Sequence, residues 1–130
     1  MTASTFIIAD DHPLFRGALR QALVGIDGEQ TIIEAGDFDT ARQAAVQTPD
    51  ADLMLLDLAM PGVSGFSGLM ALRAEFASLP LVIVSASDDN VTIRRALELG
   101  ASGFISKSAG IEEIRAAIET VLSGEISTPP

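Results

Sequence analysis

The segment LMLLDLAMPG, residues 53–62, decides the fold of this chain. Four apolar residues run without a break into a single carboxylate at Asp57, and Pro61 and Gly62 follow shortly after. A short and nearly continuous apolar run is typical of a strand that is covered on both faces, as in a parallel sheet. The segment therefore predicts a buried strand that ends at an acid and leads into a tight turn, with Pro61 and Gly62 as its central residues.

Four other apolar runs share this character. Together with the first segment they predict strands at residues 6–9, 31–35, 53–58, 81–86 and 103–106. The segments between them carry apolar residues at helical spacing, which predicts helices within residues 14–26, 41–45, 69–76, 91–99 and 111–122. For the fourth helix we expect Asp88 as the N-cap and Gly100 as the C-terminal stop, and Gly124 should end the fifth.

The alternation of strands and helices predicts an α/β fold with right-handed crossovers. Five such units favour a (βα)5 flavodoxin-like three-layer sandwich, with a parallel five-stranded sheet in the order 2-1-3-4-5. Ligands of such folds bind beyond the carboxyl ends of the strands, near the point where the strand order reverses. We expect this domain to span residues 1–124 and residues 125–130 to begin a linker or C-terminal tail.

Composition narrows the functional classes. The chain has 130 residues, of which 48% are hydrophobic, and it contains no cysteine. It has no apolar run of about 18 residues, the length a membrane span needs, and the N-terminus lacks the basic region of a signal peptide. These features predict a cytoplasmic protein without a membrane partner.

Eight basic and eighteen acidic residues give a net charge of -10, which repels nucleic acid. Any contact with DNA should therefore come from another domain.

The carboxyl ends of the predicted strands carry polar residues that should meet at one edge of the sheet. These residues are Asp10 and Asp11 after the first strand, Asp57 after the third, Ser85 after the fourth and Lys107 after the fifth. Taken singly, each has an ordinary explanation as a solvated loop residue, a cap or a turn former. Taken together, the fold predicts three carboxylates, a hydroxyl and an ammonium in one cluster.

Clustered carboxylates repel one another, and a divalent cation relieves that repulsion. Mg²⁺ prefers oxygen ligands, so we expect it to bind Asp10, Asp11, Asp57 and the backbone carbonyl of Ala59. A carboxylate beside Mg²⁺ can attack phosphorus and form an aspartyl phosphate. Asp57 would then be the nucleophile, while Lys107 and Ser85 would stabilise the charge on the phosphoryl oxygens.

Two other features are interpreted without a catalytic role. His12 precedes Pro13, which should start the first helix, so His12 is interpreted as a loop or capping residue. The glycines of GVSGFSG, residues 62–68, have the spacing G-x-x-G-x-x-G, which differs from the dinucleotide-binding fingerprint. The sequence therefore gives no indication of a nucleotide cofactor.

These motifs resemble the receiver domain of bacterial two-component response regulators over nearly the whole chain. The resemblance rests on Asp10-Asp11, on Asp57 within LLDLAMPGVSG, on Ser85 within VSAS and on Lys107 within GFISK. The segments DDHPLFRGAL and SGEISTPP are similar to the subfamily that carries a C-terminal LuxR-type helix-turn-helix domain. Many receivers have a cis proline after the lysine, whereas this chain has Ser108, for which we expect a trans bond.

The resemblance implies a signalling role. Asp57 would be the phosphoacceptor for a sensor histidine kinase, Asp10 and Asp11 would be the acidic Mg²⁺ pair, and Ser85 and Phe104 would occupy the switch positions. A core role for Phe104 is an equally good interpretation. The responsive surface would comprise the fourth helix, the fifth strand and the fifth helix. It would support a phosphorylation-dependent homodimer and control an output, most simply transcription. The domain would catalyse its own phosphorylation and slow dephosphorylation without being a separate enzyme.

Two alternatives remain open. A Mg²⁺-dependent phosphatase would also use an aspartyl phosphate, but haloacid-dehalogenase-type sites have a second acid two residues after the nucleophile, where this chain has Ala59. A receiver-like binding module could signal without any phosphate. Uptake of phosphate by Asp57, and turnover of a phosphomonoester, distinguish these alternatives from a receiver.

Overall fold

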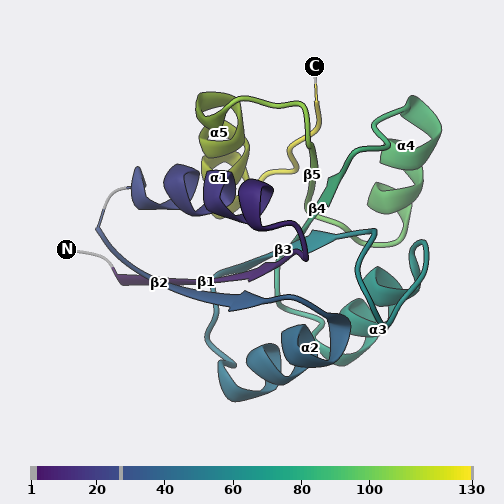
Figure 1. The fold of residues 1–130 in the computed structure, drawn as a ribbon, viewed down its shortest axis with the longest axis horizontal. Helices are drawn as coiled ribbons and strands as arrows, with labels where there is room; N and C mark the ends of the chain where they lie inside the picture. Colours follow the sequence, from purple (N-terminus) through teal and green to yellow (C-terminus); the bar gives the residue numbers. More distant parts are fainter. Residues whose placement is uncertain (1–2, 27, 130) are drawn as a thin grey trace.

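The computed structural model describes residues 3–26 and 28–129 and contains ten alternating elements (Figure 1). They are β1 (Ala3–Ala9), α1 (Pro13–Val24), β2 (Glu29–Ala35), α2 (Phe38–Gln47), β3 (Leu53–Asp57), α3 (Ser67–Glu75), β4 (Leu81–Ser85), α4 (Asn90–Glu98), β5 (Gly103–Ser106) and α5 (Ile111–Leu122). Among the described residues, no helix is both long and apolar enough to cross a bilayer.

The strands form one parallel sheet in the order β2-β1-β3-β4-β5, which confirms the predicted fold. Every residue of β3 is buried, as its uninterrupted apolar sequence predicts. β1 and β2 begin earlier than predicted because the ladder between them already pairs Ala3 with Glu29. The first residues of both strands are polar or exposed, so no apolar pattern marks them in the sequence.

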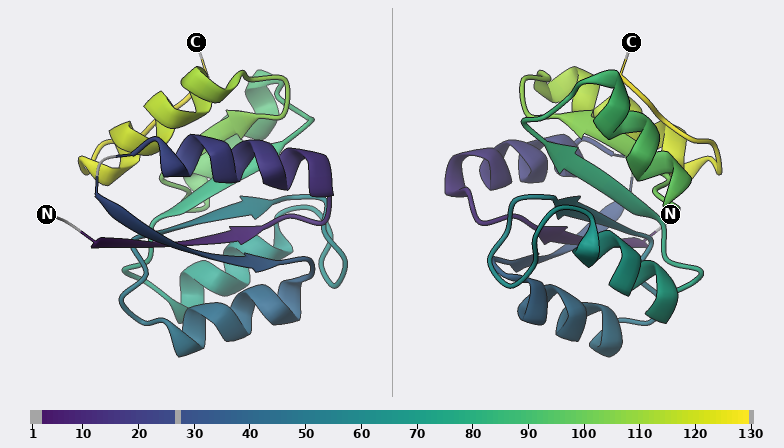
Figure 2. Two further views of the ribbon diagram at one scale, coloured as in Figure 1. Left: turned by 60° about the vertical axis from the view of Figure 1, so that its left-hand side comes forward. Right: turned by 90° about the vertical axis from the view of Figure 1, so that its right-hand side faces the viewer.

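Two apolar layers cover the two faces of the sheet. Helices α1 and α5 pack on one face, while α2 and α3 lie on the other (Figure 2). Helix α4 belongs to the second layer, where Ala96 packs with the buried residues of α2 and α3. Phe104 of β5 is buried in that same layer. The alternate residues of β5 thus serve different cores, since Ile105 packs in the layer of α1 and α5.

The start of α4 differs from the prediction. The prediction that Asp88 is the N-cap is wrong, because the N-cap is Asp89. The backbone of Asp89 is extended, and its carboxylate accepts a hydrogen bond from the Thr92 N–H at 2.8 Å. Asp88 instead accepts a hydrogen bond from the Ser106 hydroxyl at 2.8 Å. Two adjacent acids satisfy the same sequence rule for a cap, and their backbone geometry decides which of them caps the helix.

The other predicted turns are confirmed. Gly62 has a φ of +96°, as a type II turn after Pro61 requires, and Gly100 has a φ of +105° just beyond α4. Pro13 is the first residue of α1, and Gly124 follows the end of α5. All peptide bonds within the described residues are trans, including the bond between Lys107 and Ser108.

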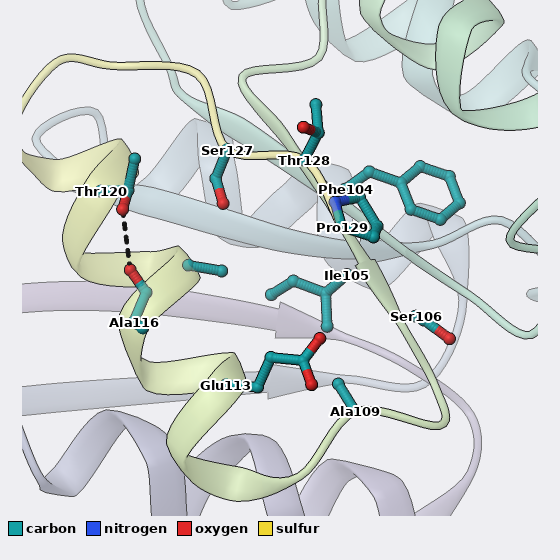
Figure 3. Close-up of a pocket in the computed structure, with 11 residues that line it drawn as sticks. Phe104, Ile105, Ser106, Ala109, Glu113, Ala116, Thr120, Ser127, Thr128 and Pro129 are labelled. Carbon is teal, nitrogen blue, oxygen red and sulfur yellow. Dashed lines mark hydrogen bonds between the residues drawn. The ribbon is translucent and has the colours of Figure 1, made fainter. Parts of the chain in front are cut away.

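The segment 125–129 lies against the edge of β5 (Figure 3). Ser127 forms a parallel bridge with Gly103: the Phe104 N–H donates to the Ser127 carbonyl at 3.0 Å, and the Ser127 N–H donates to the Ser102 carbonyl at 3.2 Å. A Cβ at position 103 would lie 3.2 Å from that Ser127 carbonyl and 3.1 Å from Val121, so the close approach favours glycine. That this segment begins a linker stays a prediction.

Candidate functional site

Two carboxylates are buried where neighbouring strands end. Asp10 follows β1 and is 0% exposed, and Asp57 is the last residue of β3 and is 2% exposed. β1 and β3 are adjacent in the sheet, and the N–H of Asp10 is fixed by the Ala35 carbonyl at 3.0 Å. Buried charges of the same sign are costly unless cations or hydrogen bonds compensate them. The fold places ligand oxygens of these two acids within 4.8 Å of each other.

Lys107 supplies the nearest positive charge. Its Nζ donates to Asp57 Oδ2 at 2.8 Å and lies 3.4 Å from Asp10 Oδ2. The residue follows β5, and its N–H donates to the Ser85 carbonyl at 2.9 Å, which aims the side chain across the end of the sheet. The ammonium also lies 5.4 Å from the centre of the Phe15 ring, a cation–π distance. One ammonium thus neutralises part of the charge of two buried carboxylates.

The second oxygen of Asp57 is held by the loop that follows it. Asp57 Oδ1 accepts a hydrogen bond from the Ala59 N–H at 2.9 Å. With Lys107 on Oδ2, both oxygens have a fixed donor, so the carboxylate is oriented before any ligand arrives. Ala59 lines two adjoining surface hollows, one shared with Asp11 and Ser85 and the other with Asp57 and Lys107.

The acidic cluster fits a divalent cation. Oxygens of Asp10, Asp11 and Asp57 lie within 4.8 Å of one another. Within the described part of the chain, Asp10 Oδ2 and Asp11 Oδ1 are buried atoms that accept no hydrogen bond. Lys107 pairs with only two of these three carboxylates, Asp10 and Asp57, and carboxylate oxygens are the hard donors that Mg²⁺ prefers. A cation would satisfy the two unpaired oxygens and balance the remaining charge.

Two further predicted residues are Ser85 and Phe104. Among the described residues, neither side chain forms a hydrogen bond with Asp57, and Ser85 lines a hollow with Asp11. Ser85 is the last residue of β4, is buried, and its hydroxyl oxygen accepts a hydrogen bond from the Ser87 N–H at 3.0 Å. Among the described residues its hydroxyl donates no hydrogen bond, and Ser85 lines the hollow that it shares with Asp11 and Ala59. Phe104 is buried in the core, so the core interpretation of this residue describes its present position.

Sequence reasoning missed two contacts. His12 is the N-cap residue of α1 by position, but its ring caps nothing and its Nδ1 lies 2.8 Å from Lys107 Nζ. Ser106 joins β5 to the loop before α4 through its hydrogen bond to Asp88. The adjacency of His12 to two acids was the available signal for the first contact, whereas nothing in the sequence marks the second.

Comparisons with known proteins agree with this geometry. The family model described as the response regulator receiver domain matches residues 6–119. A relative named glycerol metabolism activator, from Pseudomonas putida, is 44% identical over 95% of this chain and 56% of its own length. The DNA-binding transcriptional activator EvgA of Escherichia coli K12 is 38% identical over 91% of this chain and 57% of its own length. The chain thus spans little more than half the length of these relatives.

A solved structure gives the same result in three dimensions. The isolated receiver domain of RcsB from Salmonella enterica serovar Typhimurium, determined with the phosphomimetic BeF3-, superimposes with a TM-score of 0.86. The two chains are 25% identical over 98% of this chain and 94% of the other. These comparisons give no support to the phosphatase alternative. The chain belongs to the receiver-domain family of response regulators.

Proposed function

We propose that Asp57 accepts a phosphoryl group from a phosphohistidine of a sensor kinase. The observation that carries this proposal is the oriented, buried carboxylate of Asp57, held by Lys107 on one oxygen and by the Ala59 N–H on the other. In the transfer, a bond forms between an Asp57 oxygen and phosphorus while the phosphorus–nitrogen bond of the donor breaks. The imidazole nitrogen of the donor keeps the electron pair.

The neighbouring residues have defined roles in this proposal. Lys107 already contacts Asp57 Oδ2 and stabilises the negative charge of the phosphoryl oxygens. Ser85 Oγ accepts from the Ser87 N–H, so its own hydrogen is available to a phosphoryl oxygen. Asp10, Asp11, Asp57 and the Ala59 carbonyl would hold Mg²⁺, which when bound supplies positive charge that offsets the repulsion between carboxylate and phosphoryl group.

The signal would leave the site through the loop between β4 and α4. Movement of Ser85 toward a phosphoryl oxygen shifts this loop, and the Asp88–Ser106 hydrogen bond connects the loop to β5. Phe104 lies two residues before Ser106, and its N–H donates to the Ser127 carbonyl, so the same displacement would reach the segment after α5 (Figure 3). The α4–β5–α5 surface is therefore the proposed switching surface, with Ser85 and Phe104 as its switch residues.

The proposed partners follow from this surface. Helix α4 exposes Val91, Arg94, Arg95 and Glu98, a mixed set that suits a phosphorylation-dependent homodimer. Arg115 is not available for such a contact, because its guanidinium donates to the Ala22 carbonyl at 3.1 Å and to the Gln21 carbonyl at 3.2 Å. The output would be transcription through a C-terminal DNA-binding domain, by analogy with EvgA, which is named a DNA-binding transcriptional activator.

The test is phosphorylation by a small phosphodonor. With acetyl phosphate and Mg²⁺, we expect intact-mass spectrometry to find one phosphoryl group on the wild-type chain and none on Asp57→Asn. The matched control is Asp50→Asn, which changes an exposed acid between α2 and β3 and should behave as the wild type. An undiminished adduct on Asp57→Asn contradicts the assignment of the nucleophile. A wild-type chain that takes no phosphate supports the phosphorylation-independent binding module.

A further inference from the structure

The ring of His12 lies inside the acidic cluster. Its Nδ1 is 3.1 Å from Asp11 Oδ1, 3.4 Å from Asp10 Oδ1 and 3.4 Å from Asp57 Oδ2. One atom from each of these four residues falls within a group whose members are no more than 4.8 Å apart. The side chain is 56% exposed, so burial does not force the ring into this position.

The backbone around His12 explains why the ring faces inward. The N–H of His12 donates to Asp10 Oδ1 at 2.6 Å, and Pro13 starts α1 directly afterwards. These two constraints fix the direction of the Cα–Cβ bond. The position of the ring is therefore tied to the same acid that lies deepest in the cluster.

The contact with Lys107 identifies the chemical character of Nδ1. Nζ of Lys107 is 2.8 Å from Nδ1, and an ammonium can only donate hydrogen bonds. Nδ1 is therefore the acceptor in this contact, and an acceptor nitrogen has the lone pair that a bond to a metal ion requires. Its lone pair points toward the cation of Lys107, at the place where the carboxylate oxygens converge.

The distances also suit a shared metal ion. In an octahedral site with bonds of about 2.1 Å, neighbouring ligand atoms are about 3.0 Å apart. The separations of Nδ1 from its three carboxylate oxygens are 3.1 to 3.4 Å, close to that value. Independently, Asp10 Oδ2 is a buried oxygen, 3.4 Å from Lys107 Nζ, that accepts no hydrogen bond among the described residues.

We propose that Nδ1 of His12 is a metal ligand and that it gives this site a preference for Mn²⁺ over Mg²⁺. Imidazole nitrogen suits transition-metal ions, whereas Mg²⁺ prefers oxygen and keeps water in its place. When the metal binds, Lys107 releases Nδ1 and keeps its hydrogen bond to Asp57. The inference rests on the proposed function, because it uses the same acidic cluster.

The first test compares the affinities of the two ions. The variant His12→Asn removes the imidazole and keeps a residue type that is favourable at a helix N-cap. We expect its Mn²⁺ affinity, measured by isothermal titration calorimetry at pH 8, to fall by at least about 10-fold, because even the loss of an outer-shell partner of a metal ligand costs that much. Its Mg²⁺ affinity should stay almost unchanged. The proposal is overturned if the ratio of Mn²⁺ affinity to Mg²⁺ affinity is the same in His12→Asn as in the wild type.

The second test detects the bond itself. The chain contains a single histidine, so labelling with ¹⁵N-histidine marks His12 alone among the imidazoles. Pulsed electron paramagnetic resonance of the Mn²⁺-loaded protein should show a ¹⁵N coupling that is absent from His12→Asn. Bound Mn²⁺ without this coupling overturns the role of His12 and leaves the proposed phosphoacceptor function intact. If the wild-type chain binds neither ion, the metal site of the proposed function fails together with this inference.

Discussion

Helices α5 and α4 flank the same strand, β5, yet the two are held very differently. α5 buries Ile114, Ile118 and Val121 against the sheet and α1. α4 buries one residue, Ala96, and Val91 in its first turn is 78% exposed. The α1–α5 layer is thus a firm support, whereas α4 has few apolar contacts to lose. An element with little burial opens locally at low cost, which suits the helix that follows the Ser85 loop.

The largest expected difference lies in core truncation. Ile118→Ala in α5 should lower the free energy of unfolding by about 3 kcal/mol, because it leaves a cavity among fully buried side chains. The matched variant Ile93→Ala in α4 changes a partly buried side chain and should cost about 1 kcal/mol. Guanidinium chloride denaturation followed by circular dichroism measures both values. Equal losses would mean that α4 is packed as firmly as α5.

A smaller difference is expected for two arginines. Arg115→Met removes the hydrogen bonds from α5 to the carbonyls of Ala22 and Gln21, and should lower the free energy of unfolding by about 1 kcal/mol. Arg94→Met changes an exposed residue of α4 and should stay within about 0.5 kcal/mol of the wild type. Urea denaturation of both variants tests the comparison. If Arg94→Met lowered the free energy of unfolding more than Arg115→Met, α4 rather than α5 would be the more firmly held helix.

The smallest effect concerns the start of each helix at low pH. Hydrogen bonds from the backbone N–H and the hydroxyl of Thr92 lower the pKa of Asp89 below its ordinary value of 3.8. The ionised cap therefore stabilises the folded state above pH 3.8, and this contribution disappears as the pH falls through the lowered pKa. The N-cap of α5 is Gly110, which has no side chain that titrates. Acid should accordingly loosen the first turn of α4 through Asp89.

Amide hydrogen exchange of Thr92, compared at each pH from 5 to 3, measures this loosening. The wild type should lose protection at Thr92 as the pH falls, and Asp89→Asn should show a flatter dependence because its cap does not titrate. Asp37, the N-cap of α2, also has a pKa that is lowered by its hydrogen bonds with Thr40. A measurement of global unfolding would therefore combine the contributions of both caps to stability. A local measurement separates them. A pH dependence at Thr92 that is identical in the variant would contradict the role of Asp89.

Sequence reasoning predicted the sheet order and the acid cluster because both depend on periodic patterns. The uninterrupted burial of β3 and the acids at the strand ends follow from local residue order. The position of the His12 ring depends on the conformation of side chains, and the choice of Asp89 over Asp88 depends on backbone angles. The inward turn of Arg115 depends on α1, which lies far away in the sequence. The adjacency of His12 to two acids only hints at the first feature, and no local pattern of residues determines any of the three.

The contact of residue Ser127 with β5 has a consequence for how the protein behaves at high concentration. The edge of a sheet offers unpaired N–H and C=O groups to any other chain, and this favours strand-by-strand aggregation. Here Ser127 takes part of the β5 edge, and Pro129 just beyond it has no N–H to offer a further strand. At the opposite edge, Glu29 of β2 is exposed, and Glu34 forms ion pairs with Arg16 and Arg20. Both borders of the sheet therefore discourage self-association through edge pairing.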